Sequence, residues 1–270
     1  MKNYFLLLFI SIISVGLNAQ DYDYFIKVGS QKQSEKDYET AASNFSKAIA
    51  LNTKNPIGYY LRGKLFGEIG SNTEAINDFT KVIELAPNDN AGYFERAQIR
   101  HSIKDLYGAL EDYSSAITLL PKWEELFFCR ARVKIDLGDF SGALRDWSRG
   151  IELDYNFRDM RNYAFQAVIK IQLNDFDGAI HDADSAITSS PNYGYGYYAR
   201  GLAKLKKENY NASISDLTKS IELDTENSYA YYCRGIAKYK LNYKKDAWYD
   251  FKKASDMGNS DATNALRSYY

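Results

Sequence analysis

The stretch Tyr59-Tyr60-Leu61-Arg62-Gly63 decides the fold, because variants of it return along the chain at a fixed interval. The arginine recurs 34 residues later at Arg96, again at Arg130, and then, after one gap of 70 residues, at Arg200 and Arg234. A self-similar period of this length indicates a solenoid of stacked repeats. Such a fold offers an extended surface, so its function depends on what lies against that surface. The repeated phrases are Tyr93-Phe94-Glu95-Arg96-Ala97, Phe127-Phe128-Cys129-Arg130-Ala131, Tyr197-Tyr198-Ala199-Arg200-Gly201 and Tyr231-Tyr232-Cys233-Arg234-Gly235.

Alignment on this period divides the chain into seven units and a short tail. In each unit, apolar residues recur at spacings of three and four, as in Ala75, Phe79 and Val82, which predicts two α-helices. The tail, residues 262–270, is expected to form a helix that covers the apolar face of the last unit. The units are 22–55, 56–89, 90–123, 124–157, 160–193, 194–227 and 228–261.

Start and stop signals mark the second helix of each unit. A side chain that can accept a hydrogen bond from exposed helix N–H groups precedes it, as Asp105 does. Ser71 and Glu74 have the spacing of a capping box. Pro87, and its equivalents in other units, ends the second helix. Each unit is therefore expected to be a helix–turn–helix hairpin.

The units resemble tetratricopeptide repeats. The eighth position is small, the twentieth is mostly alanine, the twenty-fourth is mostly aromatic and the thirty-second is often proline, as in Gly63, Ala75, Phe79 and Pro87. This resemblance implies an all-α, right-handed superhelical solenoid of helix–turn–helix hairpins. Arginine replaces the family's leucine at the seventh position, and unit 160–193 departs further, with Gln166 at that position.

The recurring arginines have partners of opposite charge at the same period. In an antiparallel hairpin, the seventh and twenty-third positions lie at about the same height, so we expect charge-assisted hydrogen bonds between the helices. The alternative function for these arginines is a row of anion-binding side chains. The predicted structural ladder comprises Arg62, Arg96, Arg130, Arg200 and Arg234 with Asp78, Asp112, Asp146, Asp182, Asp216 and Asp250.

Residues 1–19 have the pattern of a secretory signal peptide. Lys2 precedes an apolar run from Phe5 to Leu17, and Ala19 offers a small-residue cleavage site. An uncleaved anchor is the alternative, although thirteen apolar residues are short for a membrane span. The prediction is export, to a periplasmic, envelope-associated or secreted location, without a membrane span after cleavage.

Composition and motifs exclude several functions. A net charge of −1 gives no sign of a nucleic-acid partner. The two histidines, His101 and His181, have no Glu or Cys at ligand spacing, so neither a metal site, a catalytic group nor a cofactor is expected. Cys129 and Cys233 occupy the same position three units apart, too far for a disulfide bond. The sequence predicts a binding protein that is not an enzyme.

The resemblance places positions 2, 5, 9, 12 and 13 of each unit in a concave groove. Aromatic and apolar residues recur at the fifth position, and the last two units add more at the other positions. Tyrosines there are typical of binding hot spots, although some could instead pack between helices. Residues 194–270 also carry 13 Lys and Arg against 9 Asp and Glu, which suggests basic flanks. We expect the groove to hold a segment of another protein, with a glycan as the alternative ligand. The candidate groove residues are Tyr60, Phe94, Phe128, Tyr195, Tyr198, Leu202, Lys206, Tyr229, Tyr232, Ile236, Tyr239 and Lys240.

Overall fold

The computed structural model describes residues 20–154 and 161–269, and all regular secondary structure within these ranges is helical. Residues 20–34 form the first described helix. The expected signal segment, residues 1–19, lies outside the described residues. The helices that follow are α2 (Tyr38–Leu51), α3 (Pro56–Glu68), α4 (Asn72–Leu85), α5 (Asn90–Ser102), α6 (Leu106–Leu119), α7 (Glu124–Asp136), α8 (Phe140–Leu153), α9 (Arg161–Gln172), α10 (Phe176–Ser189), α11 (Gly194–Lys206), α12 (Tyr210–Leu223), α13 (Ser228–Lys240), α14 (Lys244–Asp256) and α15 (Ser260–Tyr269).

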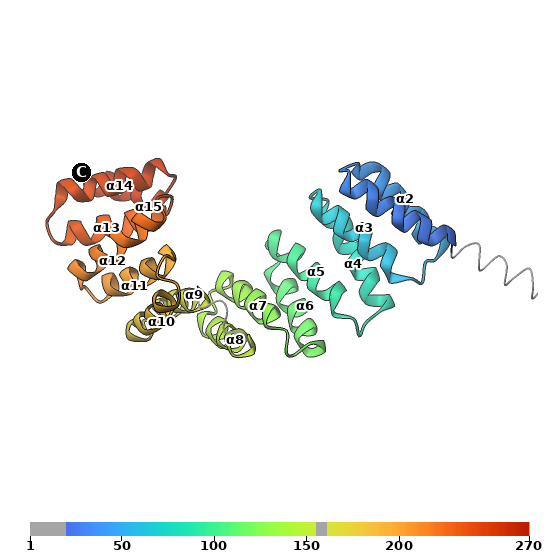
Figure 1. Cartoon of the computed structure of the whole chain (residues 1–270), viewed down its shortest axis with the longest axis horizontal. Coiled ribbons are helices and arrows are strands. Elements are labelled where there is room, and N and C mark those ends of the chain that lie inside the picture. Colours follow the sequence, from blue (N-terminus) through green and yellow to red (C-terminus); the bar gives the residue numbers. More distant parts are fainter. Residues whose placement is uncertain (1–19, 155–160, 270) are drawn as a thin grey trace, which may run out of the picture. The chain divides into compact units, whose positions relative to one another are not determined.

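Successive helices pack as antiparallel hairpins (Figure 1). The chain divides into two compact units between Val133 and Lys134. In the first unit, α3 pairs with α4 and α5 pairs with α6; in the second, α9 pairs with α10, α11 with α12 and α13 with α14. The predicted all-α fold of helix–turn–helix hairpins is confirmed. Among the described helices, none is both long and apolar enough to cross a membrane.

Small residues allow the two helices of a hairpin to approach closely. A Cβ atom added to Gly235 would lie 2.7 Å from the ring of Phe251, and one added to Gly29 would lie 2.7 Å from the ring of Phe45. Both rings are fully buried. Any larger residue in place of Gly29 or Gly235 would therefore have to displace a core aromatic side chain.

Most of the predicted caps form, but not all. Asp37, Asp105, Asp139 and Asp175 each accept a hydrogen bond from a backbone N–H group in the first turn of the following helix. Ser71 has similar backbone angles but makes no side-chain cap bond, so the predicted capping-box role of this residue is wrong. Asn209 likewise makes no side-chain cap bond, so an acceptor at this position is not sufficient for a cap.

The tail folds as a helix against the last hairpin. It begins two residues earlier than expected, at Ser260, and Tyr270 lies outside the described residues. Ala265 joins a buried cluster with Ala247 and Phe251, and Leu266 packs against it. The side chain of Asn259 accepts a hydrogen bond from the N–H of Ala262 and caps the helix.

Candidate functional site

The repeated arginines are held by aspartates of their own hairpins. Arg96 donates from Nε and Nη2 to the two carboxylate oxygens of Asp112, at 2.9 and 2.7 Å. This fork-on-fork geometry is the strong, oriented form of a charge-assisted hydrogen bond. Because the guanidinium groups are occupied in this way, they are unsuited to a row of sites for an external anion. The same bidentate pairing joins Arg62 to Asp78, Arg200 to Asp216 and Arg234 to Asp250.

The remaining nitrogen of each guanidinium reaches the preceding hairpin. Arg96 donates from Nη1 to the hydroxyl of Thr80 at 2.8 Å, and Arg62 donates in the same way to Ser46. A single side chain thus links two helices of its own hairpin to the one before. This position was not predicted from the sequence, although its acceptors recur at the same period as the arginines. Further examples are Arg130 to Ser114, Arg200 to Asp184 and Arg234 to Thr218.

A second cation, which the sequence analysis also missed, lies against most of these aspartates. Lys204 contacts Asp216 at 2.8 Å, and Lys134 contacts Asp146 at 2.7 Å. These basic residues come one helical turn after the arginine position, so the basic residue and the arginine of a hairpin face the same carboxylate. The other examples are Arg100 to Asp112, Lys170 to Asp182 and Lys238 to Asp250.

Asp182 is the exception in the predicted ladder. Gln166 stands where the arginine would be, and its amide donates to Ser148 at 2.7 Å instead. Lys170 lies 2.7 Å from Oδ2 of Asp182 but does not make a well-directed hydrogen bond with it. Burial raises the pKa of Asp182, and Lys170 only partly opposes that effect.

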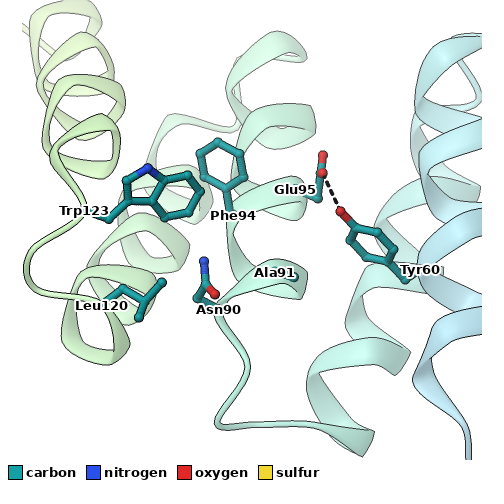
Figure 2. A pocket seen from close by; sticks show the side chains of 7 residues that line it. All are labelled: Tyr60, Asn90, Ala91, Phe94, Glu95, Leu120 and Trp123. Atoms are coloured by element: carbon teal, nitrogen blue, oxygen red, sulfur yellow. Dashed lines mark hydrogen bonds between the residues drawn. The ribbon is translucent and has the colours of Figure 1, made fainter.

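A hollow of about 460 Å³ lies beside α5 in the first unit. Figure 2 shows the ring of Trp123 facing that of Phe94, with Asn90 and Leu120 next to them. The centres of the two facing rings are 4.9 Å apart. Two of the predicted groove residues, Tyr60 and Phe94, therefore line one hollow together with Trp123, which the sequence analysis did not select.

One side of this hollow is polar. The hydroxyl of Tyr60 donates to Oε1 of Glu95 at 3.0 Å (Figure 2). Lys64 lies 3.4 Å from the same oxygen. Partial burial and the nearby Glu95 carboxylate raise the pKa of Tyr60 to about 12, so its hydroxyl remains a donor at neutral pH. The hollow thus combines aromatic walls with an amide and a carboxylate.

Trp123 occupies a position at which other hairpins cap a helix. The equivalent residues Asn55, Asp89 and Asn227 accept hydrogen bonds from the first turns of α3, α5 and α13. An indole has no acceptor for this purpose. Residues that give up a favourable local interaction are often placed for function, and this departure from the repeat could have identified Trp123 from the sequence.

A second aromatic cluster lies in the other unit. The ring of Tyr195 is 4.8 Å from that of Phe165 and 5.4 Å from that of Tyr198, measured between ring centres. Tyr193, which replaces the cap of α11, lies 6.1 Å from Tyr195. Burial raises the pKa of Tyr195 to about 12. Neither Phe165 nor Tyr193 was predicted from the sequence, because they lie at the sixth and the last position of their unit, outside the positions expected to face the groove.

The predicted groove residues of α11 and α13 are mostly shared with the core. Tyr198, Leu202, Tyr232 and Ile236 are half-buried and pack against the cluster that contains Leu217 and Cys233. Of the two expectations for these positions, packing between helices therefore applies to these four side chains, which also hold adjacent hairpins together. Tyr239 stacks on Tyr269 at 4.3 Å, Phe128 is half-buried, and Tyr229, Lys206 and Lys240 are exposed.

The described residues contain no group of three or more His, Cys, Asp or Glu side chains arranged to hold a metal ion. Cys129 and Cys233 are both free thiols, each in a different compact unit. Burial raises the pKa of Cys129 to about 11 and that of Cys233 to about 12. Thiols with such pKa values are weak nucleophiles at neutral pH.

Comparison with known proteins agrees with the helix-hairpin fold. The family model described as tetratricopeptide repeat matches residues 58–89 and 195–227, which fall on α3–α4 and α11–α12. No curated protein sequence matches the chain.

Solved structures extend this likeness over most of the chain. A tetratricopeptide repeat protein from Parabacteroides merdae is 21% identical, with 92% of this chain and 98% of that one covered at a TM-score of 0.72. The C-terminal part of a repeat-containing protein from Cytophaga hutchinsonii is 16% identical, with 89% and 99% covered at a TM-score of 0.68. YrrB, described as having an unusual peptide-binding site, is 21% identical, with 70% and 97% covered at a TM-score of 0.61.

Proposed function

We propose that this chain is a non-enzymatic scaffold that binds a segment of another protein outside the cytoplasm. The observation that carries the proposal is the hollow lined by Phe94 and Trp123, with Asn90 and the Tyr60–Glu95 pair also in its lining. Concave sites with apolar walls and a few oriented polar groups are typical ligand sites. The export part of the proposal rests on the signal-like pattern of residues 1–19.

The chemistry of the hollow favours a particular kind of segment. An apolar or aromatic side chain of the segment would lie in the hollow against the contacting rings of Phe94 and Trp123, where it loses its contact with water. The amide of Asn90 has both a donor and an acceptor, so it can pair with one peptide group of an extended chain. Peptide binding by YrrB, which shares the fold, is consistent with this assignment.

The substitution Trp123→Asn tests the proposal, because it removes the ring and restores the residue found at Asn55 and Asn227. Peptides would be selected on the full chain from a displayed random library and their affinities measured by fluorescence polarisation. We expect the variant to bind the selected peptides roughly 10–100-fold more weakly, since burying an aromatic side chain contributes about 1.5–3 kcal/mol. Its stability should stay unchanged or rise by about 1 kcal/mol, because a cap is gained.

Tyr107→Ser is the matched control, since Tyr107 is 73% exposed on α6 and does not line the hollow. It should bind the selected peptides like the unmodified chain. Equal affinities for the Trp123→Asn variant and the unmodified chain would contradict the assignment of the hollow.

Glycan binding is the second candidate function. It is favoured by the Asn90 amide and the Glu95 carboxylate, which line the same hollow as the Trp123 ring, since a sugar offers both a face that stacks on the ring and hydroxyls that pair with such groups. An oligosaccharide array distinguishes the two candidates. The glycan function would be established if the full chain bound sugars that the Trp123→Asn variant does not bind, and if no displayed peptide bound at the hollow.

A further inference from the structure

The outer face of α14 differs from that of every preceding second helix. Trp248 is 37% exposed and Tyr249 is 56% exposed, and their ring centres lie 5.4 Å apart. Lys245 precedes this pair by one turn and Lys252 follows it by one turn, so the four side chains share one face about 10 Å long. We define these four residues as the α14 face.

The repeat itself shows that the fold does not require an aromatic residue at Tyr249. The same position is exposed in the six preceding hairpins, and each of them carries a polar or charged side chain there. A large ring in this place keeps apolar surface in contact with water and gains nothing for the core. The six equivalents are Ser43, Asn77, Glu111, Arg145, His181 and Ser215.

The two lysines depart from the repeat in the same way. In the six preceding hairpins, the position equivalent to Lys252 carries a hydrogen-bond acceptor, for example Thr218. All but one of these acceptors pair with the arginine of the hairpin that follows, as Thr218 does with Arg234. At Lys245 no preceding hairpin has a cation, and the equivalent in α12 is Asn211. Both substitutions therefore add positive charge on either side of the exposed rings.

Neighbouring charges keep this face basic. α14 exposes four lysines and two aspartates, Asp246 and Asp256, the latter paired with Lys252. The third aspartate of the helix, Asp250, is buried and held by Arg234 and Lys238. The opposite side of α14 packs against α13 and α15, which leaves the α14 face directed outward.

We propose that the α14 face docks on an anionic lipid surface. Tryptophan and tyrosine prefer the boundary between lipid headgroups and acyl chains, since each has an apolar ring and one polar group. Long lysine side chains can lie beside such rings while their ammonium groups reach lipid phosphates. Attraction to anionic lipids adds to the burial of the rings, and a single amphipathic face then gives reversible, peripheral binding.

The test replaces the α14 face with the residues that α12 carries at the same positions. The variant Lys245→Asn, Trp248→Ile, Tyr249→Ser and Lys252→Thr should fold, because Asn211, Ile214, Ser215 and Thr218 occupy those sites in α12. Circular dichroism and thermal unfolding check this. The full chain and the variant share the same N-terminus, so any lipid binding by residues 1–19 is equal in both.

Vesicles of phosphatidylcholine, with or without about one-third phosphatidylglycerol, serve as the probe in a flotation assay. We expect the full chain to bind anionic vesicles on the order of tenfold more tightly than the variant at low salt. The difference should vanish on neutral vesicles and at high salt, because attraction between exposed charges is screened. Brominated lipids should also quench the fluorescence of the full chain more than that of a Trp248→Phe variant.

A matched control neutralises two lysines elsewhere, Lys81→Ser and Lys219→Ser, which lowers the net charge by the same amount. It should bind anionic vesicles like the full chain. Equal binding by the α14 variant and the full chain would overturn the proposal. The proposal would also be overturned if the full chain bound immobilised polyglutamate and showed no preference for anionic vesicles, since the partner would then be an acidic protein. Peptide binding at the hollow should persist in the α14 variant, so the two proposals fail independently.

Discussion

At the residue scale, one arginine per hairpin joins three helices. Arg96 holds Asp112 through two nitrogens and Thr80 through the third, and all three groups are largely removed from water. Charge-assisted hydrogen bonds of this kind contribute more than neutral ones, particularly where the geometry is bidentate. Leucine at the same position, as in the tetratricopeptide pattern, would supply apolar area but no such fixed register.

Arg96→Ala should lower the free energy of unfolding by roughly 2–3 kcal/mol, because it removes bonds to a charged, buried partner. Asp112 keeps Arg100 as a neighbour, which limits the loss. Thr80→Val should cost about 1 kcal/mol alone, and less when Arg96 is already alanine, since the two side chains interact. Urea unfolding of both single variants and the double variant measures this coupling.

The control is Lys81→Ala, because the pair between Lys81 and Glu84 is exposed and should contribute little. Strict additivity of Arg96→Ala and Thr80→Val would contradict the link between hairpins. The variant Arg96→Lys keeps the charge but loses the fork, and it should recover only part of the loss.

At the element scale, the α9–α10 hairpin departs most from the others. Gln166 replaces the arginine, and Ala183 stands where other hairpins have an aromatic or large apolar residue. Asp182 consequently lacks an arginine partner, and its burial raises the pKa of its carboxyl group although Lys170 lies close to it. A buried carboxylate with incomplete pairing lowers the free energy of unfolding, so we expect this hairpin to be locally less stable than the others.

The free energy of unfolding of the Asp182→Asn variant, relative to that of the unmodified chain, should increase as the pH rises from 4 to 7. Because the folded pKa of Asp182 lies above its unfolded value, its contribution to stability is complete below the unfolded pKa. It is lost as the pH rises through the folded pKa. Urea unfolding at several pH values would reveal the trend.

Asp216→Asn in the next hairpin is the comparison for this measurement. Asp216 receives two hydrogen bonds from Arg200, so its replacement should destabilise the fold at pH 7. A larger loss for Asp182→Asn than for Asp216→Asn at that pH would refute the weakness assigned to α9–α10.

At the scale of the whole molecule, cohesion comes from contacts between neighbouring helices rather than from covalent bonds. Within the compact units, hairpins pack on their neighbours, as α4 does on α5 in the first unit and α12 does on α13 in the second. In repeat folds, stability is close to a sum of such nearest-neighbour terms. Cys129 and Cys233 are free thiols and form no covalent cross-link.

The chain without residues 1–19 should give a strongly helical circular dichroism spectrum, because the described residues form helices throughout. Its thermal midpoint should be the same with and without reductant, since both cysteines are free thiols. A midpoint that falls on addition of reductant would show that a disulfide contributes. Slow alkylation of the native chain is also expected, because burial raises the pKa of both thiols.

The sequence by itself determined the hairpin fold, because its period, its small residues and its helix caps all act locally. The second helices begin at Tyr38, Asn72, Leu106, Phe140, Phe176, Tyr210 and Lys244, each directly after the predicted cap position. The pairing of arginine with aspartate could also be predicted, since both recur at one period and a hairpin brings them to the same height.

Only the tertiary structure decided which side chains form a surface. Tyr198 and Tyr232 have the same repeat position as Phe94, but packing against adjacent helices makes them part of the core as well. Trp123 joins Phe94 in a hollow because the loop that follows α6 brings its indole ring back against α5. Periodicity fixes the direction of a side chain within its own helix. Whether that side chain meets a neighbour or water depends on how adjacent helices pack, and local sequence rules do not encode this.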